Sequence, residues 1–147
     1  MIIIDKPVPI RNGDIVSIDI EMFGQEKTRL HLLEGDLACA QFAIGDKAWL
    51  LTDMKLIKEA IDLLTICKYV VGHNLLYDIR QLRRWFDIEP MFNIWDTMLM
   101  EQNLFAGYYD HFSLADLSRR WLGSYMDKNV RESFFTAQEL SPTMMLS

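Results

Sequence analysis

Residues 15–23 read IVSIDIEMF, and this stretch decides the fold because its residue types alternate along the chain. Every second residue from Val16 to Ile20 is apolar and β-branched, and side chains two apart in a strand share a face. Asp19 and Glu21 fall on the opposite face, near the carboxyl end of the stretch. The pattern predicts a central strand that buries one face and presents two carboxylates on the other.

The acidic pair has two interpretations. Two like charges beside a core are unfavourable unless a cation neutralises them, and hard divalent ions such as Mg²⁺ or Mn²⁺ prefer oxygen ligands. On this interpretation Asp19 and Glu21 are metal ligands. The alternative is a strand end that emerges into solvent, where acidic residues are common. A D-x-E pattern by itself does not decide between them.

The order of elements predicts an α/β domain built on one mixed sheet. Strands are expected at Ile15–Glu21, Leu37–Ile44, Ala48–Leu51, Tyr69–Val71 and Asn93–Trp95, and helices from Thr52 or Asp53 to about Ile66 and at Leu75–Phe86, Thr97–Leu104 and Leu114–Leu122. Pro7 and Pro9 are expected to delay the first regular element. Short connections make the first three strands an antiparallel meander, and strands that alternate with helices then continue the sheet.

Composition limits the classes of function. The chain has 147 residues, which suits one domain, and half of them are hydrophobic, so it can bury a core. The net charge of −6 argues against a protein that holds nucleic acid through a broad basic surface. The longest apolar runs are a few residues, far below the roughly 20 that a membrane span needs. We expect a soluble, cytoplasmic protein with no membrane partner.

A second candidate stretch is Val70–Leu82, VVGHNLLYDIRQL, which predicts a strand, a glycine and a helix start. Asp78 falls on the apolar side of that helix, where a carboxylate needs a partner. Asn74 stands at the helix start, so it is either the N-cap or a residue that faces the site. The segment lies at the carboxyl edge of the sheet, where open α/β sheets bind ligands.

Two other polar residues have structural interpretations. Asp96 precedes the helix Thr97–Leu104 and is expected to be its N-cap. His73 adjoins the second stretch; a packed or capping histidine is the common role there, and contact with a substrate is the alternative.

Taken in order, SIDIE, GHNLLYDIRQL, WDTMLMEQNL and SLADLSRRWLG resemble the successive motifs of DEDD-type 3′–5′ exonucleases. The greatest similarity is to the proofreading exonuclease domain of family A DNA polymerases and to the RNase D group, and it runs from about Ile15 to Pro142. The resemblance implies a ribonuclease H-like fold, with antiparallel first strands, then parallel strands, flanked by helices.

The resemblance also implies site residues and partners. Asp19, Glu21 and Asp78 match carboxylates that bind two Mg²⁺ or Mn²⁺ ions, one activating water and the other stabilising the leaving 3′ oxygen. Residues near them match positions that contact substrate: Asn74, Met22, Phe23 and His73. For Met22, core packing is the alternative. The implied partners are a single-stranded DNA 3′ end, or RNA, and a polymerase domain in the same chain or a separate one, in a bacterial or phage-infected cell.

The sequence departs from this family in its third motif, Tyr-x-x-x-Asp or His-x-x-x-Asp. No Tyr or His is followed by Asp four residues later, although 126–142 resembles the segment before that motif's helix. We therefore expect residues 1–147 to be a single exonuclease domain, truncated at its C-terminus and lacking the last helix. The missing helix would expose one apolar face of the sheet, which Met144, Met145, Leu146 or self-association could cover.

An incomplete ligand set predicts weak nuclease activity or none from this chain alone. It leaves three functions open: a proofreading-type 3′–5′ exonuclease domain, a non-catalytic domain that binds nucleic acid or serves assembly, and an RNase D-like exoribonuclease.

Overall fold

The computed structural model describes residues 1–23, 35–89 and 92–126. They form a six-stranded mixed sheet with the strand order β1-β4-β3-β2-β5-β6. The strands are β1 (Ile2–Ile4), β2 (Ile15–Phe23), β3 (Asp36–Ile44), β4 (Lys47–Leu51), β5 (Tyr69–Gly72) and β6 (Ile94–Asp96). The helices are α1 (Met54–Leu63), α2 (Leu75–Phe86), α3 (Thr97–Phe105) and α4 (Leu114–Leu117), with a 3₁₀ turn at Leu64–Ile66 and a π-helical turn at Ser118–Leu122.

The predicted topology of the sheet is confirmed. β2 pairs antiparallel with β3, and β3 pairs antiparallel with β4, which is the expected meander. β5 pairs parallel with β2, and β6 pairs parallel with β5. β2 is therefore a central strand with a neighbour on each side, as the apolar run in IVSIDIEMF predicts.

β1 is a strand that the sequence did not predict. The prolines at positions 7 and 9 were expected to delay the first regular element, yet Ile2–Ile4 pairs parallel with β4 ahead of them. Three residues on a sheet edge carry too short a pattern to be distinguished from a disordered end. The carboxylate of Asp5 fixes the exit from β1, because it accepts hydrogen bonds from the Thr52 amide and hydroxyl, both at 2.7 Å.

Both large helices pack on one face of the sheet and make the core. Of the two expected start residues, Thr52 and Asp53, it is Asp53 that caps α1, accepting from the amides of Lys55 (2.8 Å) and Leu56 (3.2 Å). The apolar side chains of α1 and α2 meet those of the central strands in a single buried cluster, whose members include Val16, Ile18, Ile20, Phe42, Leu51, Ile57, Ile61, Leu75 and Leu82.

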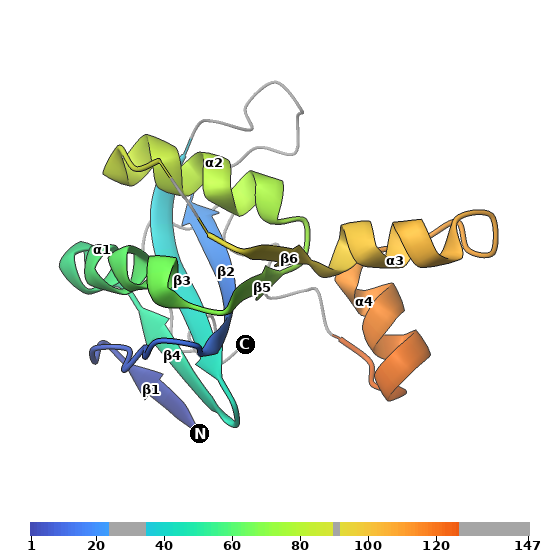
Figure 1. Ribbon diagram of the computed structural model, residues 1–147, viewed down its shortest axis with the longest axis horizontal. Coiled ribbons are helices and arrows are strands. Elements are labelled where there is room, and N and C mark those ends of the chain that lie inside the picture. Colours follow the sequence, from blue (N-terminus) through green and yellow to red (C-terminus); the bar gives the residue numbers. More distant parts are fainter. Residues whose placement is uncertain (24–34, 90–91, 127–147) are drawn as a thin grey trace.

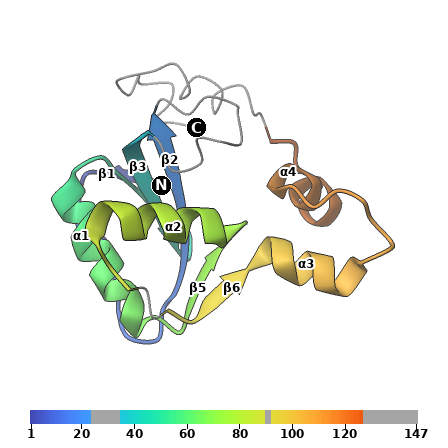
Figure 2. The ribbon, with the colours of Figure 1, turned by 90° about the horizontal axis from the view of Figure 1, so that it is seen from above.

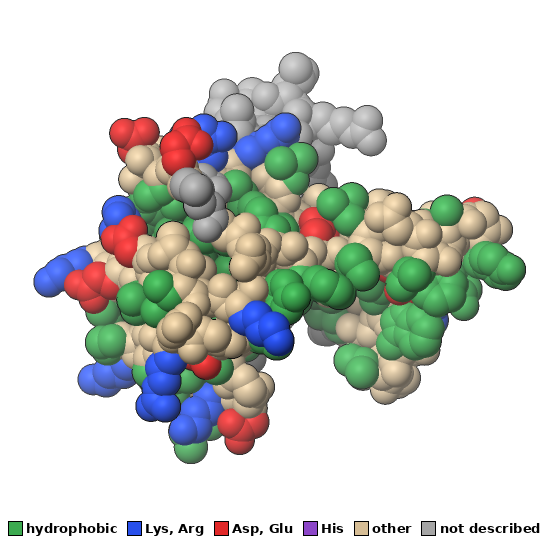
Figure 3. All heavy atoms as spheres, viewed as in Figure 1, with side chains coloured by type: hydrophobic (Ala, Val, Ile, Leu, Met, Phe, Trp, Pro, Cys, Tyr) green, Lys and Arg blue, Asp and Glu red, His purple; other side chains and the backbone are tan. Residues whose placement is uncertain are grey.

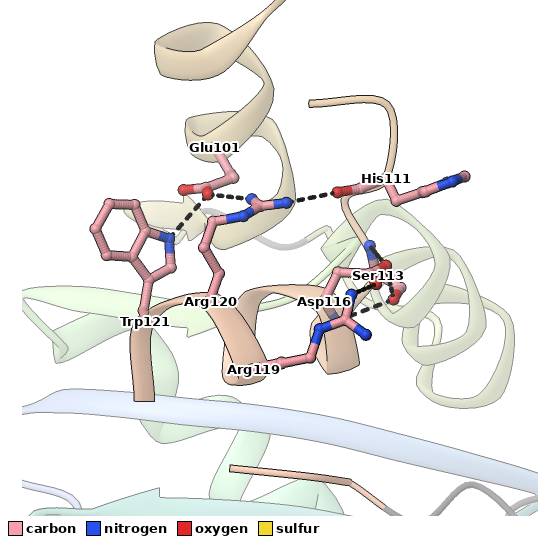
Figure 4. A network of polar contacts seen from close by, with 7 residues as sticks. All are labelled: Glu101, His111, Ser113, Asp116, Arg119, Arg120 and Trp121. Atoms are coloured by element: carbon pink, nitrogen blue, oxygen red, sulfur yellow. Dashed lines mark hydrogen bonds and ion pairs between the residues drawn. The ribbon is translucent and has the colours of Figure 1, made fainter. Parts of the chain in front are cut away.

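α3 and α4 form an arm that extends away from the sheet (Figures 1 and 2). Inside the arm, buried Glu101 of α3 accepts from the Arg120 guanidinium at 2.6 Å and from the Trp121 indole N–H at 2.8 Å (Figure 4). Ser113 and Asp116 form a capping box at the start of α4. The expected helix Leu114–Leu122 is thus an α-helix for one turn only, and a π-helical turn that ends at Gly123 follows it.

The arm presents hydrophobic side chains on its outer surface (Figure 3). Exposed members are Leu99, Leu104, Tyr108, Leu114, Trp121 and Leu122. No helix within 1–23, 35–89 and 92–126 is long and apolar enough to cross a membrane.

Candidate active site

β2 separates its side chains onto two faces as predicted. Val16, Ile18 and Ile20 are buried, whereas Asp19 is exposed and Glu21 is half-buried on the opposite face. In the ladder to β3, Asp19 lies opposite Gln41 and Glu21 lies opposite Cys39. The carboxyl half of β2 therefore carries both acidic side chains on the sheet face away from α1 and α2, which we call the acidic face.

The pairing of β2 with β3 is irregular directly after the acidic pair. Glu21 is opposite Cys39, but Met22 is opposite Leu37, so Ala38 is an extra residue in β3. Such a bulge bends and twists the strand pair, and bulges often end regular pairing beside functional sites. Here the bulge marks the end of the sheet at which the acidic side chains stand.

Asp78 of α2 reaches β2 between the two acidic residues. Its side chain is 5% exposed, and its Oδ1 accepts a hydrogen bond from the backbone N–H of Ile20 at 3.1 Å. The β2–β5 pairing extends only to Ser17, so Asp78 takes a β2 amide beyond the paired part of β5. The second motif is thereby brought to the first.

Burial is the main reason why the pKa of Asp78 is raised from 3.8 to about 7, and the neighbouring charge of Asp19 raises it further. Hydrogen bonds from the amides of Ile20 and Asp78 lower this pKa, and Glu21 contributes a smaller rise. The three predicted carboxylates thus interact electrostatically. Bringing a positive charge close to them would favour the ionised form of Asp78.

Carboxylate oxygens are ligands that fit Mg²⁺ or Mn²⁺ by their chemistry. In the part of the chain that the structure describes, however, no group of three His, Cys, Asp or Glu side chains is arranged to hold a metal ion. The carboxylates therefore have the chemistry of Mg²⁺ or Mn²⁺ ligands, but the described residues do not form a complete coordination site.

Cys39 lies beside the acidic pair but does not extend the donor set. Burial, followed by the charges of Glu21 and Asp19, raises the pKa of the Cys39 thiol to about 12. Without a metal ion the side chain stays a protonated thiol at neutral pH, so it is not a nucleophile. The chemistry of the acidic face is carried by carboxylates.

Asn74 stands at the start of α2, but the interpretation of its side chain as the N-cap is wrong. Its backbone is left-handed (φ 60°, ψ 45°), and its side chain does not cap the first turn of α2, all of which is described. The Asn74 side chain is exposed, which leaves it accessible at this edge of the sheet. A role in substrate binding stays a prediction.

His73 is half-buried and joins the ends of two parallel strands. The Thr97 hydroxyl donates to the carbonyl of Gly72 at 3.0 Å, so it accepts from Nδ1–H of His73, which lies at 2.9 Å. This bond assigns the proton to Nδ1. A packed histidine describes these contacts; contact with a substrate stays a prediction.

Met22 and Phe23 have different surroundings. Met22 is 3% exposed and belongs to the buried core cluster, which favours the core-packing alternative for it. Phe23 is half-buried at the end of β2. The predicted contacts of both with substrate remain predictions. The segment 127–142, which resembles the lead-in to a third motif, and Met144, Met145 and Leu146 lie outside the described residues.

Asp96 does more than the sequence indicated. It caps α3 as predicted, accepting at Oδ1 from the amides of Met98 (2.9 Å) and Leu99 (3.3 Å). The same carboxylate also accepts from the amide of Asn74 at Oδ1 (3.1 Å) and from that of Leu75 at Oδ2 (2.8 Å). The only sequence signal for this second role is the acid at the end of β6, the strand paired with β5.

Comparison with known proteins identifies the family. Residues 10–145 match the sequence family described as 3′–5′ exonuclease, which is nearly the whole chain. This protein therefore belongs to the 3′–5′ exonuclease family, and the resemblance to DEDD-type exonucleases is confirmed. No curated protein sequence is significantly similar to the chain.

Solved exonuclease structures share the fold. Brucella melitensis NrnC bound to pGG is 20% identical over 99% of this chain and 71% of that chain, with a TM-score of 0.74. The Aedes aegypti Nibbler EXO domain is 12% identical over 98% of this chain and 78% of that chain, also with a TM-score of 0.74. Escherichia coli RNase D is 18% identical over 90% of this chain and 34% of that chain, with a TM-score of 0.64. The predicted mixed α/β sheet is confirmed by these matches.

Proposed function

We propose that this domain hydrolyses phosphodiester bonds at a nucleic-acid 3′ end, with Asp19, Glu21 and Asp78 as ligands of divalent metal ions. The observation that supports this most is the hydrogen bond from the Ile20 amide to Asp78, because Ile20 stands between Asp19 and Glu21 in the sequence. This bond supports a shared site, because it anchors the second motif's carboxylate to the strand that carries the first motif's two carboxylates.

Each residue has a distinct part in this proposal. Asp19 and Glu21 supply oxygen ligands from a rigid central strand, and Asp78 supplies one from a helix whose carboxylate is already anchored by the sheet. Bound Mg²⁺ or Mn²⁺ would supply a more acidic water and charge stabilisation for the phosphate and the leaving oxygen. Exposed Asn74 and half-buried Phe23 and His73, which neighbour the three carboxylates in the sequence, are the proposed contacts of the terminal nucleotide.

Divalent ions also account for how an acidic protein approaches nucleic acid. The chain carries a net charge of −6, which repels phosphates at long range. Cations bound at the carboxylates reverse the local charge, so substrate binding at this site should require the metal. The NrnC structure with bound Mg²⁺ belongs to a protein of the same fold.

The expected turnover rate of residues 1–147 depends on how many metal-binding carboxylates they supply. Three carboxylates are available where the family motif pattern has four, and no Tyr-x-x-x-Asp or His-x-x-x-Asp occurs in the sequence. We therefore propose weak turnover or none by this chain alone, with metal binding retained. A polymerase domain, in the same chain or separate, stays the proposed partner.

The test is shortening of 5′-labelled single-stranded DNA and RNA of one sequence in Mn²⁺, by the wild type and Asp19→Ala. Slow loss of nucleotides from the 3′ end, abolished by Asp19→Ala, supports the proposal, and the faster substrate identifies the nucleic acid. Rapid shortening that Asp19→Ala abolishes would overturn the weak turnover alone. Nucleic-acid binding without metal binding at millimolar Mn²⁺ would instead establish a non-catalytic binding domain.

A further inference from the structure

The carboxylate of Asp96 joins the starts of two helices. Asp96 ends β6, is 8% exposed, and accepts four backbone hydrogen bonds, two from α3 and two from the Asn74–Leu75 start of α2. The first amides of a helix lack partners within the helix, and the helix dipole favours a negative charge beside them. One buried anion thus satisfies both helix starts at once.

α2 depends on this carboxylate because it lacks a cap from its own leading residue. Asn74 occupies the cap position in a left-handed conformation, and toward the described residues of the first turn its side chain makes no capping bond. The Thr97 hydroxyl ties the same two segments together through the Gly72 carbonyl. The start of α2 is therefore held from β6.

The position of Asp78 follows from the start of α2. Asp78 comes three residues after Leu75, about 4.5 Å along the helix axis, within the same stiff turn. Two hydrogen bonds hold that turn. Oδ2 of Asp96 accepts from the Leu75 amide at 2.8 Å, and the Asp78 carboxylate accepts from the Ile20 amide of β2 at 3.1 Å. A shift at Leu75 would carry Asp78 away from β2.

We propose that Asp96 is a positioning residue of the nuclease site: it fixes the first turn of α2 so that Asp78 stays beside Asp19 and Glu21. This inference rests on the proposed function, since it concerns the same three carboxylates. Asp96 acts through hydrogen bonds to backbone amides and through the helix, and it contacts neither the substrate nor a metal.

The informative variant is Asp96→Ser. Serine is a good N-cap, so α3 keeps its cap, but one hydroxyl on a shorter side chain cannot also reach the amides of Asn74 and Leu75. Asp53→Ser is the matched control, because Asp53 has the same capping role at the start of α1. Both variants exchange an aspartate cap for a serine cap, and Asp53 caps a helix that carries none of the three carboxylates.

Two readouts report the position of Asp78: hydrogen exchange at the Ile20 amide and Mn²⁺ affinity by calorimetry. In Asp96→Ser we expect exchange at Ile20 to be about tenfold faster, relative to the core amide of Phe42, because the Asp78 bond is lost. We expect Mn²⁺ to bind about 10–100-fold more weakly. In Asp53→Ser both quantities should stay within about twofold of the wild type.

Equal Ile20 exchange and equal Mn²⁺ affinity in the two variants would overturn the inference. A wild type that binds no Mn²⁺ would overturn the proposed function instead, while exchange at Ile20 would still decide the role of Asp96. If Asp96→Ser does not fold, Asp96→Asn takes its place, because it keeps one acceptor oxygen and replaces the other with an N–H donor. We expect this variant to change both readouts in the same direction by a smaller factor, and no change would overturn the inference.

Discussion

The two faces of the sheet differ although the same strands build them. On the face that α1 and α2 cover, Val16 is 0% and Ile18 is 4% exposed. On the acidic face, Ile15 of the same strand is 53% exposed, and Asp19 is exposed as well. One face thus stabilises the fold, and the other presents the side chains that carry the proposed chemistry.

The acidic face is not uniformly polar. Register places Ile2 and Ile4 of β1 and Trp95 of β6 on the same side as Asp19. These side chains are 51%, 42% and 42% exposed, respectively. The same face of the sheet therefore carries exposed apolar side chains on its two edge strands as well as the carboxylates on its central strand. Burial alone does not separate the faces, because Cys39 and Leu50 on the acidic face are also buried; the helices identify the core face, and the carboxylates identify the functional one.

The largest expected loss of stability comes from a substitution on the core face. Phe42→Ala removes a ring that is 1% exposed, and a change of this kind costs about 3–5 kcal/mol of unfolding free energy. Urea unfolding followed by circular dichroism measures it. Ile15→Ala, on the acidic face, is the control with a small expected loss. Similar losses for the two substitutions would contradict the assignment of the faces.

A smaller effect is expected at Gly72, where β5 passes into α2. A Cβ at this position would lie 2.3 Å from Cδ2 of Leu75 and 3.0 Å from the Ile18 carbonyl oxygen. Gly72→Ala should therefore cost about 1–3 kcal/mol of unfolding free energy, measured by urea unfolding. Gly45→Ala is a weaker control, since its Cβ would meet nothing within 4 Å and the strain comes only from φ +60°. A neutral Gly72→Ala would show that α2 does not pack this closely.

Asp78 sharpens the comparison because replacing it should stabilise the metal-free protein, whereas the two substitutions above should destabilise it. Its pKa is raised from 3.8 to about 7, chiefly by burial and then by Asp19, so the folded protein binds this proton more tightly than the unfolded chain. Its stabilising contribution is complete below about pH 4 and is lost as pH rises through about 7. Asp78→Asn should therefore raise metal-free stability by about 1–3 kcal/mol at about pH 8.

Denaturant unfolding at about pH 4 and pH 8 measures that difference. The gain should be much smaller at the lower pH, because there Asp78 of the wild type is protonated in the folded protein and only about half ionised in the unfolded chain. With Mn²⁺ the advantage of the variant should shrink, because the wild type binds the ion more tightly and gains more stability from it. A variant that is less stable than the wild type at both pH values without metal would contradict this account.

The smallest expected effect concerns the apolar part of the acidic face. Ile15→Ser combined with Ile2→Ser should change the unfolding free energy by only about 0.5 kcal/mol per site, because each of these side chains is about half exposed. If copies of the chain associate through this face, the double variant should sediment as a smaller species at high concentration. Equal sedimentation of both proteins would show that association, where present, uses another surface such as the arm.

The sequence was sufficient where a pattern is local. Alternation in IVSIDIEMF predicted both the central strand and the face that carries Asp19 and Glu21, and helical spacing predicted the bounds of α2 correctly. Asp53 and Asp96 were recognised as caps because an N-cap acts within its own next turn. Helical spacing singled out Asp78 as a carboxylate on an apolar helix side, the family motifs implied a role for it, and the structure brings it to Ile20.

What could not be predicted depends on contacts between distant segments. The bond from Asp96 to Leu75 requires the end of β6 to lie beside the start of α2, and the Glu101–Arg120 pair joins two helices of the arm. The bulge at Ala38 depends on how β3 pairs with β2, and the sequence of β3 alone does not determine this register. A cap by the Asn74 side chain was one of two interpretations, and the acceptor that the structure shows, Asp96, is more than twenty residues away in the sequence.

The central claim is that Asp19, Glu21 and Asp78 together hold divalent metal. Calorimetric titration of Mn²⁺ into the wild type, Asp78→Asn and the control Asp46→Asn, which changes an exposed acid in the β3–β4 turn, tests it most directly. We predict that the wild type and Asp46→Asn bind with equal affinity and that Asp78→Asn binds about 10–100-fold more weakly. Equal binding by all three proteins, or no binding by the wild type at millimolar Mn²⁺, would contradict the account.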